Sequence, residues 1–401
     1  MAKISLKRQS ASTLTFLAIL TISVTAALGQ GSSVTGVGPV NRSMGGAGTA
    51  APLEAIGALH WNPGSISALP ASEVSFGIEG LLADIDLITT VGGVSSKTSG
   101  EAGVGLIPAV GWVHHLEGTP VTIGLGLYGI AGFRNNMPTD PGNPLLAGGP
   151  LFADAEILQI APTVSYALSE RLSIGVAPTV AAARLMLNPL GPSAITPAPT
   201  PGSGNRVHWG AGVQVGVYYV TDSRWHWGFT VKSPQWFEDF RFFTPAGVTG
   251  FDMDYPMILS LGTAYSGYEN WIFAVDVRYF DFANTAGYRE LGWSNVFAGA
   301  VGAQYRINDA WRVRLGYNFN QNPMHANDAF ANISTPLIQE HNIAAGVSYR
   351  LAHNIDVSLA YIYLVNNQLT GPLPSPPFGP TDTLTHQIDA HSLALGVTVR
   401  Y

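Results

Sequence analysis

Four charged residues at two-residue spacing have the clearest capacity for chemistry in this sequence. Asp276 and Arg278 form one pair, and Arg312 and Arg314 form the other. Residues two apart on a β-strand point to the same face, so each pair would present its side chains together. A guanidinium there could hold a ligand carboxylate by a charge-assisted contact. An ion-pair and hydrogen-bond network without a ligand is favoured instead, because Asp276 and Arg278 supply both charges themselves.

The sequence contains no pattern that supports a phosphate-binding, metal or catalytic site. Gly45–Gly48 is glycine-rich but lacks the Lys-Ser/Thr pair of a phosphate loop. His114 and His115 are adjacent on a predicted strand and point to opposite faces, while His208 and His226 fall at different heights on two strands. No Ser/His/acid spacing stands out. We therefore expect no catalytic residue, no metal and no cofactor.

The charged pairs lie in segments that alternate between large apolar and small or polar residues. In residues 271–279, Trp271, Phe273 and Val275 alternate with residues that include Asp276 and Arg278. The same period-two pattern, which is typical of β-strands, recurs in 121–128, 225–232, 311–319 and 393–401. A soluble sandwich would carry more charges on its polar face. We therefore expect the apolar face to meet lipid and the other face to line an interior.

Composition supports a secreted membrane protein. Hydrophobic residues make up 46% and charged residues 11% of the chain, against about 25% charged in soluble domains. Residues 1–29 carry Lys3, Lys7 and Arg8 before an apolar run, and are predicted to be a signal peptide. Removing these three cations changes the formal net charge from -7 to -10, which disfavours nucleic acid as a partner.

Connections between the predicted strands alternate in length. Short turns fall near 117–119, 169–170, 222–223, 267–269, 308–309 and 352–353, and longer links at 92–103, 135–153, 188–205, 244–250, 283–292, 321–336 and 367–385. Bacterial outer-membrane barrels alternate tight periplasmic turns with longer outer loops. We predict an all-β fold, a transmembrane antiparallel β-barrel of about 14 strands over residues 73–401. The Pro-rich link 189–202 could form an outer lid.

Residues 30–72 show no such periodicity. They contain the run from Asn41 to Gly48 and then His60-Trp61-Asn62-Pro63-Gly64. Small residues let a backbone pack closely, and Asn-Pro favours a rigid turn. We expect this segment to be a hatch that plugs the lumen of the barrel.

The hatch and several strands resemble the FadL-type outer-membrane transporters of long-chain fatty acids and aromatic hydrocarbons. Arg42, Met44–Gly48 and Asn62-Pro63 match the hatch motifs, with Gly64 in place of the usual Ala. Gly124–Tyr128 through Gly132 resembles the third-strand motif. Further matches follow in order at Asp254-Tyr255-Pro256, Leu261-Gly262, Asp276, Gly302–Tyr305, Arg314–Tyr317 and His341.

The resemblance implies passive uptake of a hydrophobic small molecule through the outer membrane of a Gram-negative bacterium. The ligand would enter an apolar lumen pocket and leave sideways through a wall opening at Gly129, Ile130, Ala131 and Gly132. The hatch would gate these steps, with Arg42, Gly45, Gly46, Asn62, Pro63 and Gly64 as its key residues. Outer-membrane lipids and, through the strand ending at Tyr401, the barrel assembly machinery would be further partners.

Several alternatives remain open at this point. The glycines of residues 129–132 could simply fit a crowded interior, and Asn62-Pro63-Gly64 could be an ordinary surface turn. A non-selective porin is a second function, and an outer-membrane lipid-modifying enzyme is a third. A plugging hatch argues against the porin. The ligand could be an alkane, an aromatic hydrocarbon, a fatty acid or a terpene.

Overall fold

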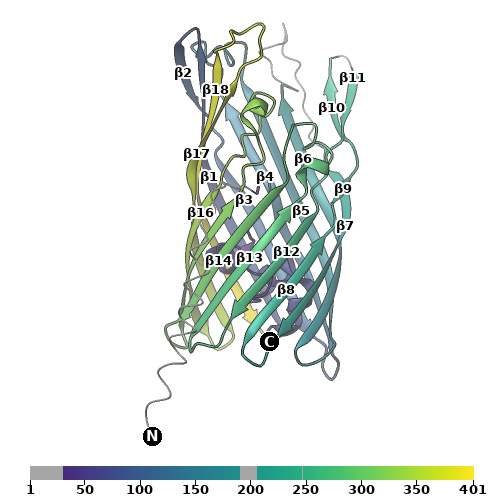
Figure 1. Ribbon diagram of the computed structural model, residues 1–401. Coiled ribbons are helices and arrows are strands. Elements are labelled where there is room, and N and C mark those ends of the chain that lie inside the picture. The colour runs from purple at the N-terminus through teal and green to yellow at the C-terminus, as the bar shows by residue number, and fades with distance from the viewer. Residues whose placement is uncertain (1–29, 190–205, 246) are drawn as a thin grey trace.

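The computed structural model describes residues 30–189, 206–245 and 247–401, and within them 14 antiparallel strands close into a barrel (Figure 1). Consecutive wall strands are neighbours, and β18 pairs with β1 to complete the ring. The predicted fold is confirmed. The wall consists of β1 (Glu73–Val91), β3 (Val104–His115), β4 (Val121–Met137), β5 (Leu151–Ala167), β6 (Leu172–Asn188), β7 (His208–Val220), β8 (Trp225–Lys232), β12 (Ile258–Tyr265), β13 (Trp271–Phe280), β14 (Val296–Arg306), β15 (Trp311–Asn320), β16 (His341–Ala352), β17 (Ile355–Pro372) and β18 (Thr383–Arg400).

Side chains alternate across the wall as the period-two pattern predicts. On β13, Val275 and Val277 are exposed on the outer face, whereas Asp276 and Arg278 are each 1% exposed in the lumen. An apolar outer face around a polar interior is the arrangement of a barrel that stands in lipid. Tyrosines on the outer face near the tight turns form the expected girdle; they are Tyr166, Tyr219, Tyr265, Tyr305 and Tyr349.

Several of the predicted long connections contain β-structure, which corrects the sequence analysis. Residues 92–103 include β2 (Val94–Ser99), which pairs with β1, and β10 (Phe240–Thr244) pairs with β11 (Gly247–Phe251). β17 and β18 also stay paired as far as Pro372 and Thr383. Pairing continues because cross-strand hydroxyl pairs such as Thr370 with Thr385, 2.7 Å apart, support these polar hairpins.

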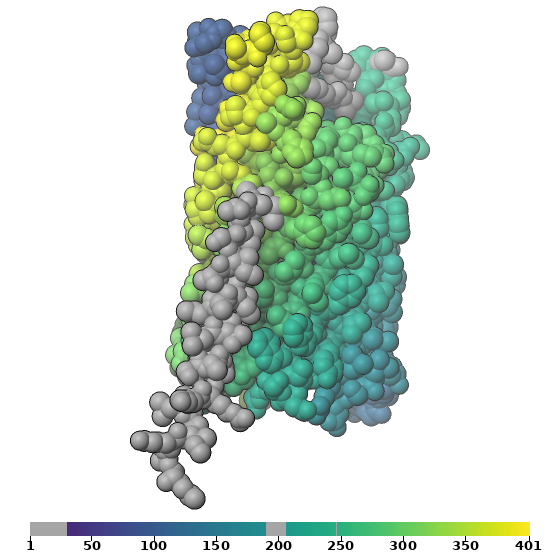
Figure 2. All heavy atoms as spheres, viewed as in Figure 1, coloured from purple at the N-terminus to yellow at the C-terminus, as the bar shows by residue number. Residues whose placement is uncertain are grey.

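The extended hairpins stand at one end of the barrel. Figure 2 shows the β1–β2 hairpin in blue and the β17–β18 hairpin in yellow at that end, opposite the C terminus in Figure 1. The other short elements are β9 (Trp236–Phe237), η2 (Phe282–Asn284) and η3 (Ala326–Asp328). The proposed lid at 189–202 lies, except for Pro189, outside the described residues, as does the predicted signal peptide 1–29. Among the described residues, no helix is long and apolar enough to cross a membrane.

The segment before β1 folds inside the barrel, where Figure 1 shows it in purple. It forms α2 (Gly38–Ser43), α3 (Ala55–Trp61) and η1 (Pro63–Ala68). Proline is the second residue of α2 and the first residue of η1, and its fixed φ is tolerated in the first turn of a helix. Glu54 caps α3 by accepting hydrogen bonds from the backbone N–H groups of Ile56 and Gly57 at 3.0 and 2.9 Å. The residues of α2 and α3 are all buried, so these elements fill the lumen at their level.

Candidate functional site

Asp276 and Arg278 tie the hatch to the wall. Their side chains form an ion pair of 2.7 Å. Asp276 Oδ2 also accepts hydrogen bonds from the backbone N–H groups of Gly48 and Thr49, at 2.9 and 3.0 Å. The Arg278 guanidinium lies 3.4 Å from the centroid of the Trp61 ring, a cation–π contact. Both charges are thus used by the hatch.

A second ion pair connects the hatch to the seam at which the barrel closes. Arg42 Nη2 lies 2.6 Å from Glu79 Oε1, and Arg42 Nε donates to Glu79 Oε2 at 2.9 Å. Glu79 is on β1, and it accepts a further hydrogen bond of 2.6 Å from Ser392 on β18. Both partners are almost fully buried. Glu79 was not predicted as a site residue, although the alternation of side chains along β1 places it on the lumen face.

Glycines allow the hatch backbone to lie directly against the wall. Gly45 and Gly46 have φ values of +66° and +83°, and a Cβ on Gly45 would stand 2.7 Å from the Tyr317 nitrogen. Inward-facing wall glycines meet the hatch in the same way, since a Cβ on any of them would overlap hatch atoms. We call this set the glycine collar; it includes Gly111, Gly175, Gly216, Gly228, Gly262, Gly302, Gly316, Gly346 and Gly396.

The Asn62-Pro63-Gly64 turn is a buried contact with the collar rather than a surface turn. Asn62 Nδ2 donates to the carbonyl oxygens of Thr49 and Val217 at 2.8 and 2.9 Å. Its Oδ1 accepts a hydrogen bond of 3.0 Å from the Gly64 nitrogen. A Cβ on Gly64 would stand 2.8 Å from the Gly216 carbonyl oxygen. The close approach to this carbonyl accounts for glycine where alanine was expected.

Arg312 and Arg314 belong to a separate network toward the tight-turn end. Arg312 Nη1 donates to Asp356 Oδ2 at 2.8 Å, and Arg400 donates to the same oxygen at 2.7 Å. Arg314 Nε donates to Gln304 Oε1 at 2.7 Å. The structure therefore brings Asp276 together with Arg278 but separates both from the other two arginines. All four charges have protein partners.

The wall is interrupted between β3 and β4. Pairing of these strands ends at Ala109 and Tyr128, although β3 remains paired with β1 as far as Val104. The β4–β5 register shifts between Gly129 and Ala131, and this bulge places Ile130 in the core.

The free edge of β4 is covered by residues 30–35, which we call the N-terminal strap. Val34 N donates to the Ile130 carbonyl at 3.1 Å, and Gly132 N to the Ser32 carbonyl at 3.4 Å. Ser33 forms an isolated antiparallel bridge with Ala131. The strap thus replaces β3 as the partner of β4 with only a few backbone contacts.

A cavity of about 520 Å³ opens at this interruption. Gly129, Ala131 and Gly132 line it. Its lining includes Leu106, 67% exposed on the outer face, and also Asn320, 2% exposed in the lumen. The cavity therefore extends from the outer surface of the wall into the interior.

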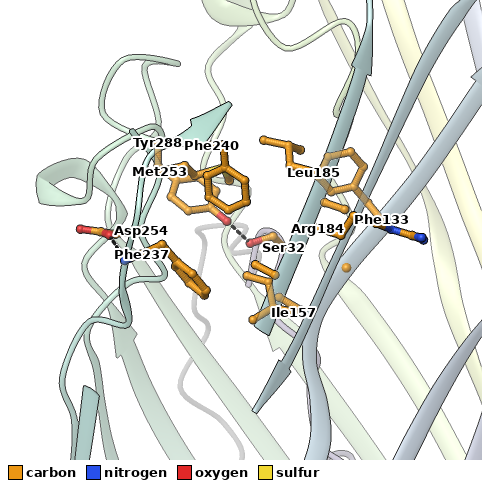
Figure 3. A pocket seen from close by; sticks show the side chains of 14 residues that line it. Ser32, Phe133, Ile157, Arg184, Leu185, Phe237, Phe240, Met253, Asp254 and Tyr288 are labelled. Carbon is orange, nitrogen blue, oxygen red and sulfur yellow. Dashed lines mark hydrogen bonds between the residues drawn. The ribbon is translucent and has the colours of Figure 1, made fainter. Parts of the chain in front are cut away.

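A smaller pocket of about 20 Å³ adjoins this cavity. Ser32, Ala131 and Gly132 contribute to both spaces. The hydroxyl groups of Ser32 and Tyr288 are 2.5 Å apart and close one side, and burial raises the pKa of Tyr288 to about 12. Figure 3 shows the apolar side chains that surround the pocket, which are Phe133, Ile157, Leu185, Phe237, Phe240 and Met253. These residues come from distant segments, so no local sequence signal could have identified them.

The histidines do not assemble a metal site within the described residues. His208 is buried against Phe240, whereas His226 is held by Tyr218 and Ser266 at 2.6 and 2.8 Å. Each therefore has its own surroundings.

The chain matches a family model described as outer membrane protein transport protein (OMPP1/FadL/TodX), over residues 17–240 and 249–401. No curated protein matches the sequence. The P. putida toluene transporter TodX is similar in structure, with a TM-score of 0.70, 16% identity, and coverage of 92% of this chain and 99% of that one. A Pseudomonas aeruginosa FadL homologue has a TM-score of 0.69, 13% identity and coverage of 92% and 99%. The Ralstonia pickettii toluene transporter TbuX has a TM-score of 0.66, 17% identity and coverage of 92% and 99%. At these identities the likeness is one of fold.

Proposed function

The chain belongs to the outer membrane protein transport family (OMPP1/FadL/TodX) of Gram-negative outer membranes, and we propose that it is a passive channel for hydrophobic small molecules. Long-chain fatty acids and hydrocarbons are the substrate classes that the family resemblance implies. Transfer of about 200 Å² of apolar surface out of water, at about 25 cal/mol per Å², would supply about 5 kcal/mol. Uptake on this basis needs no energy source.

The observation that carries this proposal is the cavity at the β3–β4 interruption. Along the axis the hatch is held by the Arg42–Glu79 and Asp276–Arg278 ion pairs and by the glycine collar. The cavity offers a different direction, because its lining joins lumen residues to the lipid-facing surface. We propose that a ligand enters this cavity from the lumen and leaves sideways between β3 and β4.

Gating is proposed for the hatch, with the N-terminal strap as its moving part. Ser32 of the strap lines both spaces, and the strap holds the β4 edge by few hydrogen bonds. The rest of the hatch would stay anchored while the strap shifts, through Arg42, Gly45, Gly46 and Asn62-Pro63-Gly64.

Filling the interruption tests the sideways route. A Cβ on Gly129 would stand 2.9 Å from Ile107 Cγ2 on β3, so Gly129→Leu should close the gap. Gly80→Leu is the matched control, since Gly80 lies on β1 outside the cavity and its Cβ would meet only Val104, at 3.5 Å. Uptake of labelled toluene and decane is measured in cells that lack the native gene, at equal surface amounts.

We expect Gly129→Leu to reduce uptake to the level of cells without the protein and Gly80→Leu to retain it. Unchanged uptake by Gly129→Leu would overturn the sideways route. Ion conductance in planar bilayers addresses the porin alternative, and the filled lumen predicts little current. A large steady current from the purified protein would favour the porin.

The C-terminal residue and the aromatic residues near it suggest two further partners. Tyr401 is 61% exposed, and its hydroxyl accepts a hydrogen bond of 2.6 Å from Trp112 Nε1. We propose that this terminal aromatic is read by the barrel assembly machinery and that the surrounding girdle contacts outer-membrane lipids.

A further inference from the structure

We propose that the N-terminal strap begins with a pyroglutamate, which forms when Gln30 cyclises after removal of the predicted signal peptide, residues 1–29. The uncharged ring would let the start of the mature chain stay buried beside the cavity at the β3–β4 interruption. This inference depends on the predicted cleavage before Gln30 and is independent of the proposed function.

The first residues of the strap are held inside the barrel by the long connection between β13 and β14. Gln30 is 2% exposed and lines the cavity of about 520 Å³, and its carbonyl oxygen accepts a hydrogen bond of 3.2 Å from the Ser33 nitrogen. Gly31 has a φ of +57°, and a Cβ there would stand 2.5 Å from Trp293 Cζ3 and 3.0 Å from Phe282 Cζ. The mature chain therefore starts in a crowded, largely apolar place.

A free N-terminus at this place would bury a positive charge. An α-amino group has a pKa of about 7.7–8.0 in water, so it is largely protonated at neutral pH. The acidic residues among the described lining of the cavity are Asp154 and Glu156, and arginine side chains lie 3.0 and 3.2 Å from their carboxylates. Arg42, which also lines the cavity, adds a charge of the same sign. Without a free counter-ion, a buried ammonium group is strongly unfavourable.

The side-chain amide of Gln30 is also unsatisfied. Its Nε2 and Oε1 atoms are both buried and have no hydrogen-bond partner among the described residues, which is unfavourable. Cyclisation removes Nε2 and the ammonium charge together. The product is a neutral lactam with a single N–H donor in place of those of an ammonium and an amide. The ring therefore suits this environment better than the open residue does.

The reaction uses only groups of Gln30 itself. The unprotonated α-amino nitrogen attacks the side-chain carbon Cδ, and the new N–Cδ bond closes a five-membered ring. The Cδ–Nε2 bond breaks, and Nε2 leaves as ammonia with one hydrogen of the α-amino group. No oxidant or cofactor is required, and the intramolecular geometry favours the step. Because both reacting groups belong to one residue, the ring can form before the barrel closes around it.

The test examines the N-terminus of the full mature protein in isolated outer membranes. Amines are blocked by reductive dimethylation at cell lysis, so that a free N-terminus present in the cell cannot cyclise during later handling. Trypsin then releases the peptide Gln30–Arg42, which contains no lysine and no internal arginine, so its only amine is the α-amino group. Mass spectrometry distinguishes the dimethylated peptide from the peptide that has lost ammonia. Gln30→Met is the matched control, because methionine has a similar length and cannot cyclise.

We expect the wild-type peptide to have lost one ammonia and to carry no dimethyl group, whereas the Gln30→Met peptide should be dimethylated. A wild-type peptide that is mainly dimethylated overturns the inference. A mature chain that starts at another residue overturns it as well.

A second measurement tests whether the ring secures the strap. Ser33 is 8% exposed and the chain has no native cysteine, so maleimide labelling of Ser33→Cys reports on opening of the strap. Gln30→Met in this background should label about tenfold faster or more at neutral pH, because its docked strap buries an ammonium group. The ratio of the two rates should fall close to one at a pH above the pKa of the α-amino group, where the amine is neutral. Equal rates at neutral pH would overturn the role of the ring in docking.

Discussion

Replacing Arg42 with methionine should loosen the hatch by leaving the Glu79 carboxylate buried without its counter-ion. The exposed fractions of the two side chains are 6% and 5%, so solvent screens this pair weakly. Removing one partner of a buried ion pair typically costs about 3–5 kcal/mol. At about 1.4 kcal/mol per tenfold, this raises the population of undocked hatch at least about 100-fold.

Cysteine labelling can measure this change because the chain contains no native cysteine. Ser43 lies in α2 and is 0% exposed, so Ser43→Cys introduces a near-isosteric thiol that reacts only when the hatch undocks. When opening is fast relative to labelling, the maleimide rate follows the open population. Arg42→Met in this background should therefore label at least about 100-fold faster than Ser43→Cys alone.

The double variant Arg42→Met/Glu79→Met separates charge from packing. Replacing both partners of a buried pair with apolar residues is often neutral, so its labelling rate should return close to that of Ser43→Cys alone. If Arg42→Met labels no faster than the background, the ion pair does not hold the hatch. If the double variant labels as fast as Arg42→Met, lost packing is the cause and the electrostatic reasoning is refuted.

Three further predictions concern stability, each followed by heat-dependent gel migration. Burial, and secondarily the charge of Glu73, raises the pKa of Glu54 from 4.5 to about 7. The contribution of protonated Glu54 to stability is therefore complete below pH 4.5 and is lost as the pH rises through 7. Glu54→Gln should flatten this dependence of stability on pH. Gly316→Ala should cost about 1–3 kcal/mol or more by overpacking against Gly45, whereas Gly105→Ala should be tolerated because its nearest contact would be 3.8 Å away. Asp356→Asn should lower the unfolding temperature by removing the shared partner of Arg312 and Arg400, and an unchanged temperature would show that this network contributes little.

The wall was predictable because its signal is local. Alternation along residues 271–279 determines which side chains share a face, and it placed Asp276 and Arg278 in the lumen, where the structure has them. The same alternation did not predict how far the strands of the longer hairpins extend. β2 and the upper part of β17 are polar on both faces, so their pairing shows only in the cross-strand hydrogen bonds.

The contacts of the candidate site could not be predicted in the same way, because they join segments that are distant in the sequence. Glu79 and Ser392 meet Arg42 only after β1 and β18 have paired. The residues that line the cavity at the β3–β4 interruption come from the N-terminal strap, from β1, from β3 to β5 and from β15 to β18, so no single segment of the sequence marks them. Loop closure over hundreds of residues leaves no short-range pattern for such contacts.

The glycine collar also constrains biogenesis. Its glycines come from strands around much of the ring and lie so close to hatch atoms that a Cβ would overlap them. We expect the N-terminal segment to be seated while the first and last strands are still apart, because these close contacts form on many strands at once. Supplying this segment as a separate peptide to a completed barrel should therefore fail to restore the plug.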